Sequence, residues 1–139
     1  MAATLKTNNN YIRVKRYFIA WRTYDFKLLR NIFVPTAQYV IRNKRRTLTG
    51  IDEIEKYWMR NKRRQKDIVL RWKMIDSQTN RDEVEFYACF EDTEMQQDFK
   101  IKVCGRIVFK YNDKGRIVKL SESYRIKPST RGTITSAKE

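Results

Sequence analysis

The chain has 139 residues, of which 41% are hydrophobic and 13% aromatic, and this composition is typical of one globular domain rather than a disordered segment. Its 31 basic and 16 acidic residues give a net charge of +15, which suits a nucleic acid, an anionic surface or an acidic protein as partner without requiring one. Histidine, the usual general base and the commonest metal ligand, is absent from the sequence, so we predict no metal site and no cofactor.

The sequence also bounds where the protein works. It has no apolar run long enough to cross a bilayer, and residues 1–10 lack the hydrophobic segment of a secretory signal. We therefore expect a cytoplasmic protein without a membrane partner. Thiols stay reduced in that compartment, so Cys89 and Cys104, each inside a predicted strand, are expected to be free structural thiols.

The first predicted element is a helix over residues 11–33, which follows a flexible lead over residues 1–10. Its buried stripe consists of apolar residues at helical spacing: Val14, Phe18, Trp21, Leu28 and Ile32. Pro35 cannot continue a helix and would end it. Asp25 falls on the same stripe, where an ionised carboxylate needs either a partner or a cavity.

A short strand over residues 37–42, a polar loop over residues 43–50 and a second helix over residues 51–65 are predicted next. Acidic residues in the first turn of this helix and basic residues at its far end complement the helix dipole. Its apolar residues recur at helical spacing: Ile51, Ile54, Tyr57 and Trp58.

The remainder of the chain is predicted to form four strands, at residues 67–76, 83–91, 98–111 and 116–127. Apolar and polar side chains alternate along them, as in a sheet with one buried face. The segment Asn112-Asp113-Lys114-Gly115 is typical of a hairpin turn between the last two. Pro128 would end the final strand and leave a mobile tail over residues 128–139. Helices followed by long antiparallel strands predict an α+β fold, with the helices on one side of a curved sheet.

Glu122 repeats the anomaly of Asp25, because it alternates in the last strand with apolar residues that are predicted to face the core: Val118, Leu120, Tyr124 and Ile126. If both carboxylates face one cavity, they form a shared polar site or an acid/base pair with raised affinity for protons. Alternatively, a buried Arg, Tyr or Trp binds each of them and they only stabilise the fold. Tyr24 and Tyr124 are the neighbouring hydroxyl groups that could join such a site.

Most aromatic side chains are predicted on the inner faces, where they would form either the core or the wall of an apolar ligand pocket. The candidate pocket residues are Tyr17, Trp21, Tyr57, Trp58, Trp72, Phe86, Phe90 and Phe109.

The pentapeptide RNKRR occurs at residues 42–46 and again at residues 60–64, so a loop and a helix end would together offer a positive patch. Its members are Arg42, Lys44, Arg45, Arg46, Arg60, Lys62, Arg63 and Arg64. A solvated surface is the plainer interpretation, since no aromatic residue interleaves the clusters as base stacking requires. Non-specific binding of phosphate groups stays open.

Four segments together resemble the nuclear transport factor 2-like, or SnoaL-like, superfamily: YDFKLLRNIFVPTAQYVI, TGIDEIEKYW, FYACFED and VCGRIVFKYNDKGRIVKLSESY. The resemblance covers residues 11–127, which we take as the domain. It implies a cone-shaped α+β barrel, in which a long N-terminal helix and a shorter helix pack in the concave face of a strongly curved, mainly antiparallel sheet. It also implies a pocket at the wide end.

Members of this superfamily include isomerases, dehydratases, polyketide cyclases and non-catalytic modules, so the resemblance leaves several functions open. Our first hypothesis is a homodimer, formed through the sheet, that binds a small apolar ligand or serves as an interaction module. An alternative is an isomerase or lyase acting on a small hydrophobic carbonyl compound, with Asp25 as base and Tyr24 or Tyr124 polarising the oxygen. A third is a basic module that binds nucleic acid or an acidic protein.

Overall fold

The computed structural model describes residues 2–94 and 99–130. The first half of the chain contains α1 (Ala2–Thr23), α2 (Phe26–Ile32), β1 (Phe33–Ile41), the 3-10 turn η1 (Arg42–Lys44), β2 (Arg46–Thr49) and α3 (Ile51–Arg64). The second half contains β3 (Gln65–Gln78), β4 (Arg81–Asp92), β5 (Phe99–Tyr111) and β6 (Ile117–Thr130). Within the described residues, every helix is too short or too polar for a transmembrane segment.

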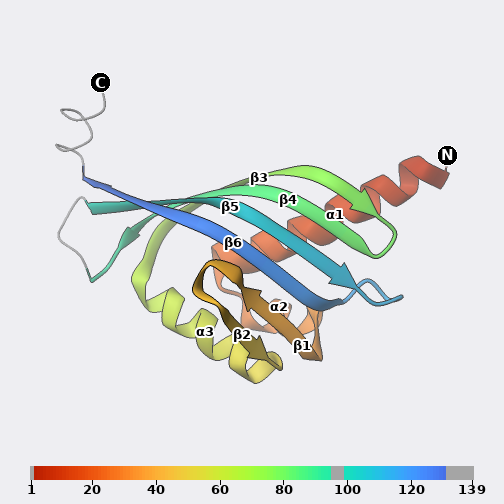
Figure 1. Ribbon diagram of the computed structural model, residues 1–139, viewed down its shortest axis with the longest axis horizontal. Helices are drawn as coiled ribbons and strands as arrows, with labels where there is room; N and C mark the ends of the chain where they lie inside the picture. The colour runs from red at the N-terminus through yellow and green to blue at the C-terminus, as the bar shows by residue number, and fades with distance from the viewer. Residues whose placement is uncertain (1, 95–98, 131–139) are drawn as a thin grey trace.

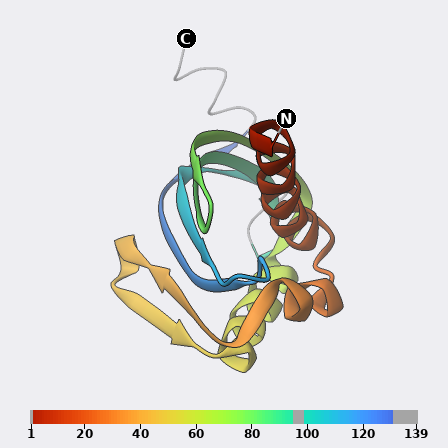
Figure 2. The ribbon, with the colours of Figure 1, turned by 90° about the vertical axis from the view of Figure 1, so that its right-hand side faces the viewer.

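All strands belong to one six-stranded sheet with the order β2-β1-β6-β5-β4-β3. The β1–β6 pair is parallel and the other pairs are antiparallel. The sheet curves strongly, with α1 lying along β3 and β4 and α3 lying beneath the β1–β2 hairpin (Figures 1 and 2). The predicted α+β architecture with a mainly antiparallel, curved sheet is therefore confirmed.

The predicted helix over residues 11–33 is two helices separated by a break. Helix α1 begins at Ala2 and ends at Thr23, and Tyr24 then adopts a left-handed conformation with φ 50°. Asp25 is extended and its side chain accepts a hydrogen bond from the backbone N–H of Leu28 at 3.0 Å, which caps α2. Aspartate is among the best N-cap residues, so a new helix starts where helical spacing alone predicts continuity.

Strand β2 lies where a polar loop was predicted. Arg45 adopts a left-handed conformation (φ 51°) that turns the chain, and β2 then pairs with β1 from Ile41↔Arg46 to Gln38↔Thr49. Only Leu48 of its four residues is buried, so β2 lacks the apolar alternation by which a strand is detected. The other predicted strands and the helix over residues 51–65 are confirmed, with shifted ends.

Strand β6 differs from the predicted strand in two respects. Pro128 pairs with Ile101 inside the β5–β6 ladder, so the strand runs past it to Thr130; residues 131–139 of the predicted tail lie outside the described residues. Val118, predicted to face inward, is exposed, and Ile117 is buried in its place. A register shift after Lys110 in the pairing of β5 with β6 changes which residues face inward at this end.

Strands β5 and β6 approach each other closely at Gly105. A Cβ atom at this position would lie 2.2 Å from the carbonyl oxygen of Ser123 on β6, which is far closer than real contacts allow. Glycine is therefore required where the backbones of β5 and β6 approach each other.

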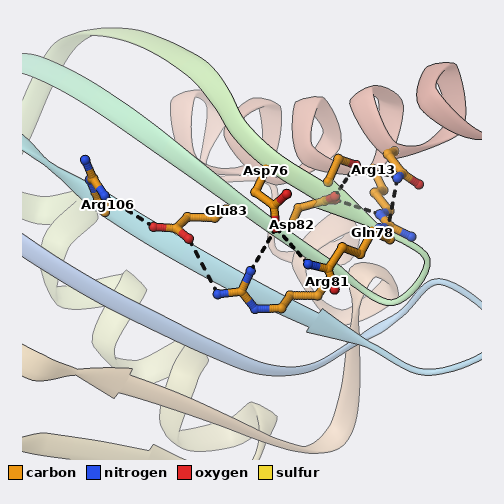
Figure 3. A network of polar contacts seen from close by, with 9 residues as sticks. Arg13, Asp76, Gln78, Arg81, Asp82, Glu83 and Arg106 are labelled. Atoms are coloured by element: carbon orange, nitrogen blue, oxygen red, sulfur yellow. Dashed lines mark hydrogen bonds and ion pairs between the residues drawn. The ribbon is translucent and has the colours of Figure 1, made fainter.

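Helix α1 is attached to the sheet by Asp82, which is fully buried on β4. Its carboxylate accepts hydrogen bonds from Arg13 Nε at 2.8 Å, Ser77 Oγ at 2.7 Å and the hydroxyl of Tyr111 at 2.8 Å. The Arg13 guanidinium also donates to the carbonyl oxygens of Thr79 and Gln78 (Figure 3). The turn between β3 and β4 and the middle of α1 are thus joined around one buried ion pair.

Candidate ligand-binding site

A cavity of about 340 Å³ lies between the concave face of the sheet and helices α1 and α3. Its apolar and aromatic lining consists of Tyr17, Trp21, Tyr24, Tyr39, Tyr57, Trp58, Phe86, Phe90, Ile101, Val103, Tyr124 and Ile126. Its charged and amide side chains are Lys44, Asn61, Arg64, Gln65, Asp92 and Glu122. This volume lies at the small end of the range for ligand pockets, and half of the lining residues are aromatic, as in sites for small apolar molecules.

Glu122 is the buried acid of this cavity. It is 6% exposed, and its Oε1 accepts a hydrogen bond from the hydroxyl of Tyr39 at 2.9 Å. Burial raises the pKa of Glu122 to about 7, while the Tyr39 hydrogen bond and the positive charge of Lys44 act in the opposite direction. The carboxyl group therefore changes charge near neutral pH, in contrast to an exposed glutamate.

Two tyrosines extend this acid into a chain of hydroxyl groups. The hydroxyls of Tyr17 and Tyr39 lie 3.2 Å apart and both are buried. When Glu122 is ionised, Tyr39 donates its proton to the carboxylate, and Tyr17 is then the donor in the contact with Tyr39. Burial raises the pKa of both phenols well above the usual range, so they stay neutral.

Gln65 forms a second polar position in the cavity wall. Its side-chain oxygen accepts hydrogen bonds from the indole N–H of Trp21 at 3.0 Å and from the hydroxyl of Tyr24. Tyr24 is able to reach it because the left-handed residue between α1 and α2 turns its side chain into the fold, where it is 8% exposed. Burial raises the pKa of Tyr24, which keeps this hydroxyl a donor.

An ion pair occupies another part of the lining. Arg64, the last residue of α3, donates from Nη2 to Asp92 at the end of β4 over 2.6 Å. Burial acts against ionisation of Asp92, but the hydrogen bond and positive charge of Arg64, together with a hydrogen bond from the backbone N–H of Glu94, outweigh it and lower the pKa of this carboxyl. Asp92 is therefore an ionised structural partner of Arg64 rather than a proton donor.

The structure brings together most of the predicted pocket. Six of the predicted aromatic residues line the cavity: Tyr17, Trp21, Tyr57, Trp58, Phe86 and Phe90. Trp72 and Phe109 do not line it. Trp72 stacks on Phe18 with ring centroids 4.7 Å apart, and Phe109 packs edge-on against Tyr17 in the core.

Three of the four candidate catalytic residues, Tyr24, Glu122 and Tyr124, line the cavity, and Asp25 does not. The prediction that Asp25 faces the core is wrong, because its side chain caps α2 on the surface. The prediction extended helical spacing across the break between the two helices, and it therefore assigned Asp25 to the buried face.

Sequence reasoning missed Tyr39 and Gln65. Tyr39 could have been found by the alternation Ala37, Tyr39, Ile41 in the first strand, all of which are buried. Gln65 carries no such signal, because it is a polar residue at a helix-to-strand junction. Its role depends on Trp21 and Tyr24, which are more than forty positions away in the chain.

The two RNKRR segments fold differently. The first forms η1 and the start of β2, and the second is the last turn of α3. Lys44 from the first and Arg64 from the second line the cavity. The other basic residues lie outside the lining with exposed side chains: Arg42, Arg45, Arg46, Arg60, Lys62 and Arg63.

No family model and no curated protein sequence matches the chain. Solved structures do match its fold. The epoxide hydrolase/cyclase-like enzyme SalBIII of salinomycin pyran-ring formation is 15% identical over 86% of this chain and 92% of its own, with TM-score 0.74. A SnoaL-like polyketide cyclase described from Shewanella putrefaciens CN-32 is 11% identical over 91% and 93%, with TM-score 0.73.

A third match is an NTF2-like protein of unknown function from Exiguobacterium sp. 255-15, 18% identical over 81% of this chain and 98% of its own, with TM-score 0.67. Sequence identities this low indicate a shared fold and do not indicate a shared activity. The chain therefore has the nuclear transport factor 2-like, or SnoaL-like, fold.

Proposed function

We propose that the cavity binds a small, mostly apolar molecule that carries a hydroxyl or carbonyl group. The observation that carries this proposal is a cavity of about 340 Å³, rich in aromatic residues, with the buried carboxyl group of Glu122 in its wall. The other buried carboxyl group of the lining, Asp92, is already paired with Arg64. Aromatic walls supply affinity by removing apolar surface from water, and a single polar group supplies orientation.

Glu122 has hydrogen-bonding capacity left for such a ligand. Its Oε1 accepts a hydrogen bond from the hydroxyl of Tyr39, and no partner of Oε2 is found among the residues whose side chains are described, 9–94 and 100–127. In that part of the chain Oε2 is not a fully buried atom without a partner, so it keeps some exposed surface. This supports its access to the cavity. A ligand hydroxyl would then donate to the ionised carboxylate, and a ligand carbonyl would accept from the protonated form.

The proposal is tested with 2-naphthol and naphthalene as probes, in calorimetric titrations at pH 8, where most Glu122 is ionised. Both probes should bind, and 2-naphthol should bind about tenfold more tightly, because a hydrogen bond to a charged group is worth roughly 1.5 kcal/mol or more. In Glu122→Leu the preference should disappear while naphthalene still binds.

Glu85→Leu is the matched control, because Glu85 is exposed on the outer face of the sheet and lies outside the cavity lining. This variant should keep the tenfold preference. If neither probe binds the unaltered protein, the proposed ligand class is wrong. Equal binding of the two probes would instead remove Glu122 as the polar contact.

Acid–base catalysis is a second candidate function, and the raised pKa of Glu122, about 7, favours it. A general base works best when its pKa lies near the working pH. In this scheme ionised Glu122 removes a proton from the carbon next to a ligand carbonyl and returns it two carbons along, which moves a C=C bond into conjugation. The SalBIII enzyme and the polyketide cyclase are matched structures with catalytic names.

The probe for this second candidate is 3-cyclohexen-1-one, whose conversion to 2-cyclohexen-1-one is followed by ultraviolet absorbance. We expect a rate that rises with pH through about 7 as Glu122 ionises, and that is lost in Glu122→Gln. A rate equal to that of buffer alone would exclude this candidate and leave ligand binding intact. Homodimer formation through the sheet, and binding of nucleic acid or an acidic protein, stay predictions from the sequence.

A further inference from the structure

Gln65 lies where three elements meet at the cavity. It is the first residue of β3 and follows the last turn of α3, with its backbone N–H bonded to the carbonyl oxygen of Asn61. Its side chain meets Trp21 from the end of α1 and Tyr24 from the break between α1 and α2. The amide is therefore held in place from both sides.

The contact with Trp21 determines which way the amide points. An indole N–H is only a donor, so the atom of Gln65 that lies 3.0 Å from Trp21 Nε1 must be the oxygen. The hydroxyl of Tyr24 donates to the same oxygen, which then has both of its lone pairs occupied. What Gln65 has left to offer is the amide nitrogen with its two N–H donors.

No acceptor for this nitrogen is found among the residues whose side chains are described, 9–94 and 100–127. Gln65 lines the cavity. Within that part of the chain its nitrogen is not a fully buried atom without a partner, so it keeps some exposed surface. It is thus an open donor that two neighbouring side chains hold in one orientation. A donor prepared in this way loses little conformational entropy when an acceptor arrives.

We propose that Gln65 is a second ligand-binding group, whose amide nitrogen donates to a ketone or ether oxygen of the bound molecule. This inference rests on the proposed function and narrows it. The ligand would carry two polar groups, one for Glu122 and an acceptor oxygen for Gln65, on an otherwise apolar frame. Unlike a carboxyl group, the Gln65 amide does not titrate, so it remains a donor at every pH at which the protein is folded.

The test compares 2-acetonaphthone with 2-isopropenylnaphthalene, in which a CH₂ group replaces the carbonyl oxygen and the shape is retained. Titrations are done at pH 8.5, where Glu122 is ionised and cannot donate to the ketone. The unaltered protein should bind the ketone about threefold to tenfold more tightly than the hydrocarbon, the range expected of one neutral hydrogen bond.

Gln65→Glu is the sharpest variant, because a carboxylate still accepts from Trp21 and Tyr24 but has no donor. In it the preference should be lost or reversed while the hydrocarbon still binds. Gln38→Glu is the matched control, since it makes the same change at an exposed position of β1, and it should keep the preference. If Gln65→Glu fails to fold, Gln65→Met should abolish the preference without adding charge.

The outcomes separate this inference from the function on which it rests. Binding of both probes to the unaltered protein with no preference, or a preference that survives in Gln65→Glu, would overturn the role of Gln65 and leave the apolar pocket standing. Failure of both probes to bind would refute the pocket itself. A purely structural Gln65 would change stability in the variants, but it would not change the ratio of the two affinities.

Discussion

Replacement of Glu122 by glutamine should stabilise the protein at pH 8 far more than at pH 5. Burial raises the pKa of this carboxyl from 4.5 to about 7, so the folded state holds a proton that the unfolded chain releases. The stability that Glu122 contributes is fully present below about pH 4.5 and is lost as the pH rises through about 7. Between pH 5 and pH 8 the loss amounts to about 2 to 3 kcal/mol.

The measurement is urea unfolding of the protein and of Glu122→Gln at both pH values. The difference between their free energies of unfolding isolates this one group, because the other titrating residues are common to both. Glu85→Gln makes the same change at an exposed position of the outer face and is the control for replacing a glutamate by glutamine. A gain of the same size at pH 5 and pH 8 would show that Glu122 has an ordinary pKa in the folded state.

Replacement of Arg13 by methionine should cost about 3 kcal/mol of stability at pH 7, because it leaves the carboxylate of Asp82 buried without its cation. The estimate is at the low end for a broken buried pair for two reasons. The Arg13 side chain is 16% exposed, and Asp82 keeps the donors Ser77 and Tyr111.

Urea unfolding of Arg13→Met, Asp82→Leu and the double variant forms a cycle that tests the coupling. The double variant should lose clearly less than the sum of the two single variants, because no unpaired charge is left in it. The control is Arg106→Met on the same sheet, which should lose no more than about 1 kcal/mol. The Arg106 side chain is 59% exposed, and its ion pair with Glu83, drawn in Figure 3, has an N···O distance of 3.5 Å. Equal losses of stability in Arg13→Met and Arg106→Met would contradict the conclusion that the buried carboxylate of Asp82 attaches α1 to the sheet.

These two carboxylates differ in how well the sequence predicted them. Glu122 was predicted to face inward because it continues an alternation in a long strand, and it does. Asp82 was assigned to a loop, since a turn rich in polar residues precedes it, and nothing local distinguishes it from its neighbours. Its partner Arg13 lies on the first helix, so only the packing of α1 on β4 brings the pair together.

Asp25 is the opposite case. Its local N-cap preference indicated a helix start, but the prediction followed the helical spacing of the apolar residues instead. The residue lies on the apolar stripe of a continuous helix, but it is also a good N-cap, and in the structure the cap is formed. The resulting break turns Tyr24 inward to Gln65 and leaves Asp25 exposed. The break in the helix therefore leaves Tyr24 in the cavity wall, as predicted, and places Asp25 outside it.

The sequence by itself determined the α+β class, the second helix, the four long strands with most of their inward-facing residues, and the inward position of Glu122. These features depend on the spacing of apolar residues within one helix or strand, and this spacing can be read from the sequence alone. The tertiary structure alone decided the pairing of Arg13 with Asp82, the orientation of the Gln65 amide and the cavity itself. Each of these arises where side chains from distant elements meet, and no pattern within one element records which residues those are.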